Sequence, residues 1–364
     1  MKSCGIVTEY NPFHNGHIYH IQKSRELTEC EVLIAVMSGN FTQRGEPAVC
    51  DKFQRTEAAL RNGVDLVIEL PFIHAVQNGS VFGSQSVALL KKAGVSDIVF
   101  GSETGNLEEL QEIASLPVNV DHLKERLHQG ESYPKAYGLL ADYIYPNDRL
   151  AVCYLRALEG SGITPHALPR SNDYNDTSLS SLASASAVRK ALLEGRDVSQ
   201  ATPMAIPDPV FMKDLYPYLR RLLLLRKRSE IQQCFLVNEG IEKLMHDAAD
   251  RYDDYEAFLK ACVNKRYTRS RIQRTALQIL CENTKEEVRA LEDPTYLRVL
   301  GFTAKGQEYL KELKKKEKII TLFKEIPPSY KVLEERAMQL YASLFPEEKR
   351  KALLKRELTG PVRI

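Results

Sequence analysis

Apolar runs alternate with amphipathic segments over the first two hundred residues. The runs predict strands at Cys4–Val7, Glu31–Ser38, Val64–Leu70, Val95–Phe100 and Ile163–Leu168. Segments with helical spacing lie between and after them, at 18–27, 52–62, 80–93, 106–116, 119–129, 132–145, 148–160 and 185–193. Strands without polar alternation are typical of parallel sheets whose two faces are both covered by helices. The pattern therefore predicts an α/β fold built on a parallel sheet.

A proline-rich stretch at 196–212 interrupts this alternation, and beyond it the strand signals fade. Leu-, Lys- and Glu-rich segments with helical spacing then continue to residue 364. At 364 residues, the chain is also longer than a usual single domain. We therefore predict an α/β domain at 1–200, followed by a smaller all-α domain at 201–364.

The charge differs between the two halves, although the net charge of the whole chain is only +2. Residues 1–200 hold 18 Lys and Arg against 24 Asp and Glu, which gives −6. Residues 201–364 hold 32 against 24, which gives +8. This asymmetry indicates a catalytic domain joined to a basic module with a polyanionic partner.

The seven cysteines are scattered and form no Cys-x-x-Cys pair. Such a set favours reduced thiols in a cytoplasmic protein and argues against a zinc site. No apolar run approaches the length of a membrane span. Since the first strand follows Met1 almost at once, we expect no signal peptide.

The most informative motif is Glu9-Tyr-Asn-Pro-Phe-His-Asn-Gly-His17, which joins the first strand to a helix. A strand, a turn and a helix start direct backbone N–H groups and a helix dipole at a phosphate. His14 and His17 can donate hydrogen bonds there, and Gly16 removes a side chain that would block a nucleotide. A solvated turn or a metal-binding pair would explain the same two histidines.

A polar loop, Met37 to Pro47, follows the second strand. Its Ser38, Gly39, Asn40, Gln43 and Arg44 are suited to holding a small carboxylate or phosphate. An ordinary β–α connection is the alternative. Lys52 and Arg55 open the next helix, where they would face the same phosphates or solvent.

Four later places in the sequence carry similar signals. Phe100-Gly-Ser-Glu103, Asn147 and Arg170 follow strand-like runs or precede helices, so a nucleotide could contact them, although turns and caps explain them nearly as well. Ser184 to Lys190 combines small hydroxyl residues with a helix start. It predicts a second phosphate-binding helix N-terminus facing the first, although serine capping alone would account for the serines.

Residues 264–274 carry five cations and a tyrosine in eleven positions. This density suits RNA phosphates and base stacking. The expected RNA-binding residues, which the resemblance described next assigns to tRNA, are Lys265, Arg266, Arg269, Arg271 and Arg274.

These motifs together resemble the tRNA(Met) cytidine acetate ligase family, within the HIGH-type nucleotidylyltransferase superfamily. The resemblance rests on Glu9–His20, Met37–Pro47 and Gly63–Pro71, and on Phe100–Glu103, Lys265–Thr268 with Arg271, and Arg298–Phe302. It covers roughly residues 1–310 and implies a Rossmann-like nucleotidyltransferase domain. The chain departs from the family pattern at Asp148–Ala151 and at Asn175.

The resemblance implies an ATP-dependent acetylation of the N4 amine of the wobble cytidine in elongator tRNA(Met). Free acetate would form acetyl-adenylate without coenzyme A, and Mg²⁺ would be carried with ATP rather than by a dedicated protein site. His14 and His17 would stabilise the departing pyrophosphate, since such catalysis depends on alignment and charge neutralisation. The implied ATP-binding residues are Val7, Thr8, Glu9, Tyr10, Asn11, Pro12, Phe13, His14, Asn15, Gly16, His17, Ile18, Tyr19, His20, Gly101, Asn147 and Arg170. No membrane and no protein partner are implied.

Two other functions remain open at the level of sequence. One is a nucleotidylyltransferase that acts on a phosphorylated small metabolite, which uses the histidines but not the basic second half. The other is a non-catalytic RNA-binding protein that keeps a relic nucleotide fold.

Overall fold

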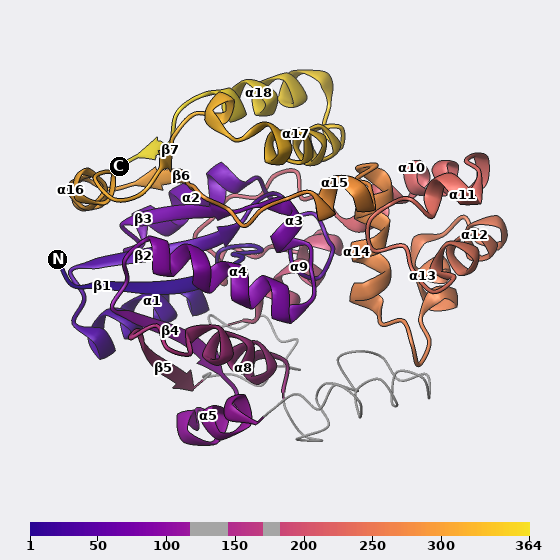
Figure 1. Cartoon of the computed structure of the whole chain (residues 1–364). Helices are drawn as coiled ribbons and strands as arrows, with labels where there is room; N and C mark the ends of the chain where they lie inside the picture. Colours follow the sequence, from indigo (N-terminus) through magenta and orange to yellow (C-terminus); the bar gives the residue numbers. More distant parts are fainter. Residues whose placement is uncertain (117–144, 170–182) are drawn as a thin grey trace.

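A single sheet forms the centre of the protein. The computed structural model describes residues 1–116, 145–169 and 183–364, and its strands follow the order β5-β4-β1-β2-β3-β6-β7, with β8 paired to β6 (Figure 1). The strands are β1 (Ser3–Thr8), β2 (Val32–Ser38), β3 (Leu66–Leu70), β4 (Asp97–Ser102), β5 (Thr164–Pro169), β6 (Leu297–Phe302), β7 (Ile319–Ile320) and β8 (Val362–Arg363). Strands β1 to β5 pair in parallel. The predicted α/β fold with a parallel sheet is confirmed.

Helices connect the strands and form most of the second half. The helices up to residue 200 are α1 (Asn15–Thr28), α2 (Lys52–Arg61), α3 (Phe72–Ala75), α4 (Gly79–Lys92), α5 (Leu107–Ser115), α8 (Pro146–Leu158) and α9 (Ala185–Leu193). Those beyond it are α10 (Met212–Leu225), α11 (Arg228–Ile231), α12 (Ile241–Arg251), α13 (Tyr255–Cys262), α14 (Arg269–Leu280), α15 (Lys285–Arg289), α16 (Ala304–Leu313), the 3₁₀ turn η1 (Phe323–Glu325), α17 (Pro328–Ala342) and α18 (Glu347–Leu358). The helices expected at 119–129 and 132–145 fall almost wholly outside the described residues. None of the described helices is long and apolar enough to span a bilayer.

The side chains of β2 explain why its sequence is apolar without alternation. Val32, Ile34 and Val36 pack on one face of the sheet, against a core that α4, α8 and α16 complete. The intervening residues of β2 pack on the other face, with side chains from α1 and α2. Because side chains alternate across a strand and both faces are covered, every position of β2 is buried.

The strand order places a topological switch beside β1. From β1 the chain proceeds to β2 and β3 on one side, and β4 and β5 add on the other side. In open parallel sheets, the loops at such a point diverge and leave a crevice at the carboxyl ends of the strands. The loop that holds His14 and His17 follows β1, so the fold directs it into that crevice.

The second half is not entirely helical, which corrects the predicted all-α character of 201–364. β6 extends the sheet by pairing antiparallel with β3, and β7 and β8 both pair with β6. All six residues of β6 are buried, including Arg298. The sequence pattern did not predict β6, because Arg298 interrupts a short apolar run. The residues that neutralise its charge lie elsewhere in the sequence. The division near residue 200 stays a prediction.

The helical part has its own core, and the Met37–Pro47 loop enters it. Phe41 is fully buried there, and its ring lies edge-on to Phe72 and Tyr341, with centroids 5.5 and 5.9 Å away. The loop after β2 is therefore fixed from both sides. It begins at the sheet and inserts an aromatic ring into the helical core.

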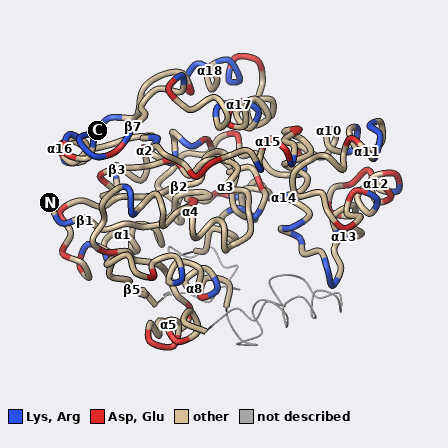
Figure 2. The backbone as a smooth tube through the Cα atoms, viewed as in Figure 1, with Lys and Arg blue, Asp and Glu red and all other residues tan. Residues whose placement is uncertain are grey.

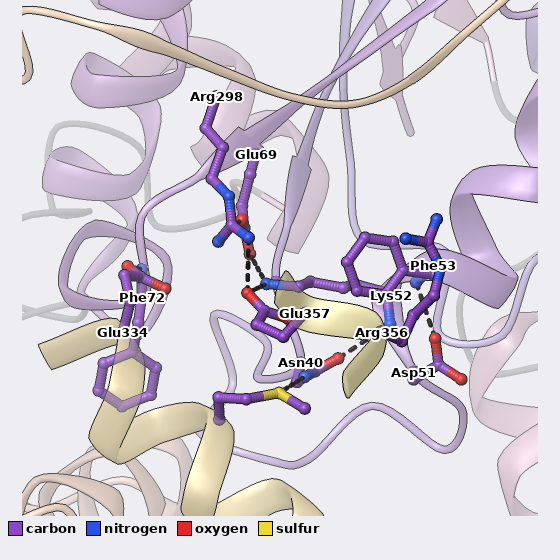
Figure 3. Close-up of polar contacts among 12 residues, drawn as sticks. Asn40, Asp51, Lys52, Phe53, Glu69, Phe72, Arg298, Glu334, Arg356 and Glu357 are labelled. Atoms are coloured by element: carbon purple, nitrogen blue, oxygen red, sulfur yellow. Dashed lines mark hydrogen bonds and ion pairs between the residues drawn. The ribbon is translucent and has the colours of Figure 1, made fainter. Parts of the chain in front are cut away.

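Four buried charges join the sheet to the C-terminal helices (Figure 3). Lys52 Nζ lies 2.7 Å from a carboxylate oxygen of Glu69 on β3 and 2.7 Å from one of Glu357 on α18. Arg298 on β6 contacts the same two carboxylates, each at 2.6 Å. Burial alone would raise the pKa of Glu357, but Lys52 and Arg298 hold it at about 2. We call Lys52, Glu69, Arg298 and Glu357 the buried ion cluster.

The position of Lys52 and Arg55 in the sequence suggested that they face a phosphate or solvent. In the structure, neither does. Lys52 belongs to the buried ion cluster, and Arg55 is fully buried. The Arg55 guanidinium donates to the carbonyl oxygens of Glu9, Ser38, Gly39 and Cys50. Both cations hold the sheet and its loops together.

A third carboxylate, Glu334 on α17, lies beside the cluster and generates a pH prediction. Burial and the charge of Glu69 raise its pKa to about 7, against the opposing effect of Lys52 and Arg298. The folded state then binds a proton that the unfolded state releases, so the free energy of unfolding falls as pH rises from about 5 to 7, by up to about 1.4 kcal/mol per pH unit. We expect Glu334→Gln to remove this contribution in denaturant titrations across that range. Exposed Glu335→Gln is the matched control, and an unchanged pH slope for Glu334→Gln would contradict the prediction.

Candidate active site

A cleft with a cavity volume of about 680 Å³ opens at the carboxyl ends of β1, β4 and β5. That volume suits a nucleotide-sized ligand. One wall comes from the loop and helix after β1, and a second comes from the ends of β4 and β5 with α8 and α9. The Met37–Pro47 loop and the first turns of α14 form a third. The cleft thus lies at the switch point and receives walls from both halves of the chain.

His14 and His17 cap α1 reciprocally and line the cleft. His14 Nδ1 accepts from the N–H of Gly16 at 3.1 Å, and His17 Nδ1 accepts from the N–H of His14 at 3.1 Å. The ring centroids are 3.8 Å apart. Since both Nδ1 atoms act as acceptors, this network assigns the proton of each neutral ring to Nε2. The capping role and the donor role therefore use different nitrogens.

Gly16 lines the cleft and also lies directly against the ring of His14. A Cβ at this position would lie 2.8 Å from Cε1 and 3.0 Å from Nδ1 of the His14 ring. The sequence had indicated that Gly16 makes room for a nucleotide. The structure shows that it also makes room for the imidazole that caps its own helix, and the nucleotide role stays a prediction.

Four further helices begin at the cleft. Their first residues line it at Asn78–Ser80 for α4, Pro146–Asn147 for α8, Ser184–Ser186 for α9, and Thr268 and Ser270 for α14. Each N-terminus carries a partial positive charge from its helix dipole, although caps and Glu103 already bind some of the first N–H groups. With α1, five helix N-termini converge on one space, which favours a ligand of several negative charges.

Glu9 is a buried acidic group in this positive environment, and Glu46 also lines the cleft. Burial raises the pKa of its carboxyl, while the backbone N–H of Gln43 and the charges of Arg44, Arg189 and Arg55 lower it. Gln43 N donates to Glu9 Oε1 at 2.6 Å, and the Gln43 side chain donates to the carbonyl oxygen of Gln77 at 2.9 Å. The loop after β2 is thereby tied to the end of β1.

The end of β4 and the start of α8 hold each other through two carboxylates. Glu103 accepts from the backbone N–H groups of Asn147 and Asp148 and from the Asn147 side chain. Asp148, almost fully buried, accepts from Ser102 Oγ and from the N–H groups of Glu103 and Thr104. The departure from the family pattern at Asp148 therefore has a local role, because it positions the Gly101 and Asn147 wall of the cleft.

The structure brings together most of the sequence-predicted nucleotide residues. Those that line the cleft are Val7, Thr8, Glu9, Tyr10, Asn11, His14, Gly16, His17, Tyr19, His20, Gly101 and Asn147. In the described structure the other four members of the Val7–His20 segment do not line it: Pro12, Phe13, Asn15 and Ile18. Asn15 instead bonds the backbone of Gln200 and Ala201. Arg170 and Asn175 lie outside the described residues.

Only part of the predicted acetate or phosphate loop lines the cleft. Gln43 and Arg44 line the cleft. Ser38, Gly39 and Asn40 lie behind it, and Gly39 and Asn40 line a small separate cavity beside Lys52, Glu69 and Glu334. Ser38, Gly39 and Asn40 therefore face the protein interior.

The basic segment 264–274 is divided as well. Lys265, Arg266 and Arg269 are exposed near the turn between α13 and α14, where Figure 2 shows a concentration of positive charge. Arg269 pairs with Glu256 at 2.7 Å. Arg271 is half-buried and donates to the carbonyl oxygen of Leu236 at 3.1 Å, while Arg274 is buried and lines the cleft. Arg274 is thus too enclosed for a surface contact with RNA, while the contact expected of Arg271 stays a prediction.

Several cleft residues were missed by sequence reasoning, namely Asn78, Ser80, Thr268 and Ser270. Asn78 and Thr268 are N-caps whose side chains accept from Val81 and Arg271 N–H groups. Their polar type before a helix was a detectable signal for a cap. Their convergence on one cleft depends on the tertiary fold, so no local signal could reveal it.

Comparisons with known proteins agree with this geometry. The sequence profile of the HIGH Nucleotidyl Transferase family matches residues 1–357. The chain is 36% identical to the tRNA(Met) cytidine acetate ligase of Oceanobacillus iheyensis, over 100% of both chains, and 38% identical to that of Limosilactobacillus reuteri, over 96% and 97%. The apo crystal structure of Thermotoga maritima TmcAL superposes with a TM-score of 0.90, at 34% identity over 100% of both chains. A second form of that protein, bound with alpha-thio ATP, gives 0.86 at the same identity and coverage.

The two capping histidines generate a prediction about ring protonation. We expect ¹⁵N-edited spectra to show the Nε2–H tautomer for the neutral rings of His14 and His17, because each Nδ1 accepts a backbone hydrogen bond. Gly16→Ala should displace the His14 ring and shift its resonances, whereas Lys23→Ala, on the exposed side of the same helix, should not. An Nδ1–H tautomer at either ring would refute the capping geometry.

Proposed function

The chain belongs to the HIGH nucleotidyl transferase family and, within it, to the tRNA(Met) cytidine acetate ligases, and from this premise we propose its reaction. It activates free acetate with ATP and transfers the acetyl group to the N4 amine of the wobble cytidine in elongator tRNA(Met). The observation that carries the proposal is the pair of capping imidazoles among five converging helix N-termini. Such an arrangement suits a bound triphosphate.

The reaction has two steps, and neither requires a covalent bond to the protein. An acetate oxygen attacks the α-phosphorus of ATP, and pyrophosphate leaves, which gives acetyl-adenylate. The cytidine amine then attacks the acetyl carbonyl carbon, AMP leaves, and the amine loses a proton. His14 and His17 donate from Nε2 to the phosphate oxygens as charge develops on the leaving pyrophosphate. The start of α9 with Arg189 faces the same oxygens.

The nucleoside half of ATP lies on the β4 and β5 side, against Gly101 and Asn147. In the described residues no group of three or more His, Cys, Asp or Glu side chains is placed to hold a metal ion. As the resemblance to the family implies, Mg²⁺ arrives with ATP as part of the substrate. The enzyme uses free acetate and needs no coenzyme A. Because its substrate is a tRNA, it acts in the cytoplasm.

The RNA approaches over the turn between α13 and α14. Lys265 and Arg266 are exposed there, and Thr268 and Ser270, which follow directly, line the cleft. Cations at the rim of the cleft suit RNA phosphates, while the cytidine base enters to reach the acetyl group.

The chemistry is tested by substitution of the two histidines. We expect His14→Ala and His17→Ala each to lower formation of N4-acetylcytidine by about 10²- to 10³-fold, because each removes a donor aimed at developing charge. Mass spectrometry of tRNA nucleosides after incubation with ATP and acetate measures the product. tRNA affinity should be nearly unchanged, and His246→Ala, on α12, is the control.

Acetylation that survives in both histidine variants would exclude this assignment. Exchange of pyrophosphate into ATP separates the alternatives, because the ligase requires acetate for exchange. A requirement for a phosphorylated metabolite would instead indicate the other nucleotidylyltransferase. Absence of exchange together with intact tRNA binding would indicate an RNA-binding protein.

The RNA surface is tested by Lys265→Ala and Arg266→Ala. Each should weaken tRNA binding and reduce the slope of log affinity against log salt by about 1, since each removes a phosphate contact. Titrations at several salt concentrations measure both quantities. Lys315→Ala is the control, because Lys315 pairs with Glu312 at the end of α16. Unchanged binding in both variants would place the RNA surface elsewhere.

A further inference from the structure

We propose that Arg274 binds the carboxylate of acetate, which deepens the proposed function and rests on it. Arg274 lies on α14, in the part of the chain that the sequence assigned to tRNA binding. It lines the cleft rather than the surface, and it is only 7% exposed. A small anion that enters the cleft can reach it.

Among the described residues, the buried guanidinium of Arg274 has no counter-ion. Within residues 1–116, 145–169 and 183–364, no Asp or Glu forms an ion pair with it, and its hydrogen bond goes to the carbonyl oxygen of Gln43 at 3.1 Å. Burial and the neighbouring charge of Arg271 lower its pKa to about 10. A buried charge normally has a partner, because desolvation is costly. An anionic ligand in the cleft would supply that partner.

Other buried cations of the chain show what a compensated site looks like. Lys52 and Arg298 each contact two carboxylates. Arg55 donates to four backbone carbonyl groups. Arg274, with a single carbonyl partner in the described structure, differs from all three. Its guanidinium retains donors for a ligand.

The position of Arg274 is fixed relative to the reaction centre. The Gln43 residue that accepts from Arg274 also donates to Glu9 at 2.6 Å. Gln273 donates to Glu46 at 3.0 Å, and a Cβ on Gly45 would lie 2.4 Å from the backbone nitrogen of Arg274. The loop after β2 is therefore packed directly on the backbone of α14. This contact holds Arg274 at a set distance from the end of β1.

The arrangement of the cleft favours acetate as the anion. In the proposed reaction the nucleoside occupies the β4 and β5 side, and the pyrophosphate lies at His14 and His17. The nucleophile must then approach from the remaining wall, where Gln43 and Arg274 lie. A guanidinium keeps the carboxylate ionised and holds one of its oxygens by a charge-assisted hydrogen bond. The other oxygen is left to attack the α-phosphorus.

The experiment measures acetate-dependent exchange of pyrophosphate into ATP in the absence of tRNA. We expect Arg274→Gln to raise the KM for acetate by about 10- to 100-fold, the range for loss of a hydrogen bond to a charged group. Arg274→Lys, which keeps the charge but loses the planar fork, should raise it less. The KM for ATP should change by less than about twofold in both. Thermal unfolding of the same samples checks that each variant is folded.

The matched control is Arg220→Gln, because Arg220 also donates to one backbone carbonyl, that of Ala249, but outside the cleft. A raised KM for ATP, or weaker tRNA binding with an unchanged KM for acetate, would overturn the proposal by assigning Arg274 to a phosphate. Unchanged parameters in both Arg274 variants would overturn it too. If the wild-type protein shows no acetate-dependent exchange, the proposed function itself fails, which is a separate result.

Discussion

The buried ion cluster is the interaction on which the arrangement of the whole protein depends. Its two cations and two carboxylates come from α2, β3, β6 and α18, and Lys52 and Glu357 are separated by 305 residues (Figure 3). Each charge is expensive to bury alone and tolerable only when its partners are in place. The cluster therefore specifies one docking of the C-terminal strands and helices on the sheet. It is as much a determinant of specificity as of stability.

The same helix carries this constraint to the active site. Lys52 opens α2, and Arg55 follows on the next turn, with its guanidinium on the carbonyl oxygens of Glu9, Ser38 and Gly39. Those carbonyl groups lie just beyond β1 and at the end of β2. A helix fixed at its first residue by ion pairs thus fixes the two loops that line the cleft. Rigid support of this kind is what a site that works by alignment requires.

Local sequence predicted the parallel strands, the helix that begins at the His14–His17 motif and the loop after β2, because each leaves a signal within ten residues. It could not predict β6, since Arg298 interrupts the apolar pattern and its partners are distant. Lys52 and Arg55 show the same limit. Their spacing of three on one helix is equally typical of a solvated face. Only the contacts with Glu69 and Glu357 distinguish a buried face from a solvated one. The sequence indicated that a glycine is needed at position 16. It did not predict the contact with the His14 ring, because that contact depends on the geometry of the helix cap.

The segment 264–274 shows how one run of cations can serve two purposes. Before α14 begins, Lys265 and Arg266 are exposed, and they can meet a large polyanion from solvent. Within α14, Ser270 and Arg274 are four residues apart and therefore on one face, which lines the cleft. Helical periodicity thus separates cations for a surface from a cation for an enclosed anion. The second half of the chain therefore completes the reaction site, because α14 supplies a wall that the sheet and the helices of the first half do not provide.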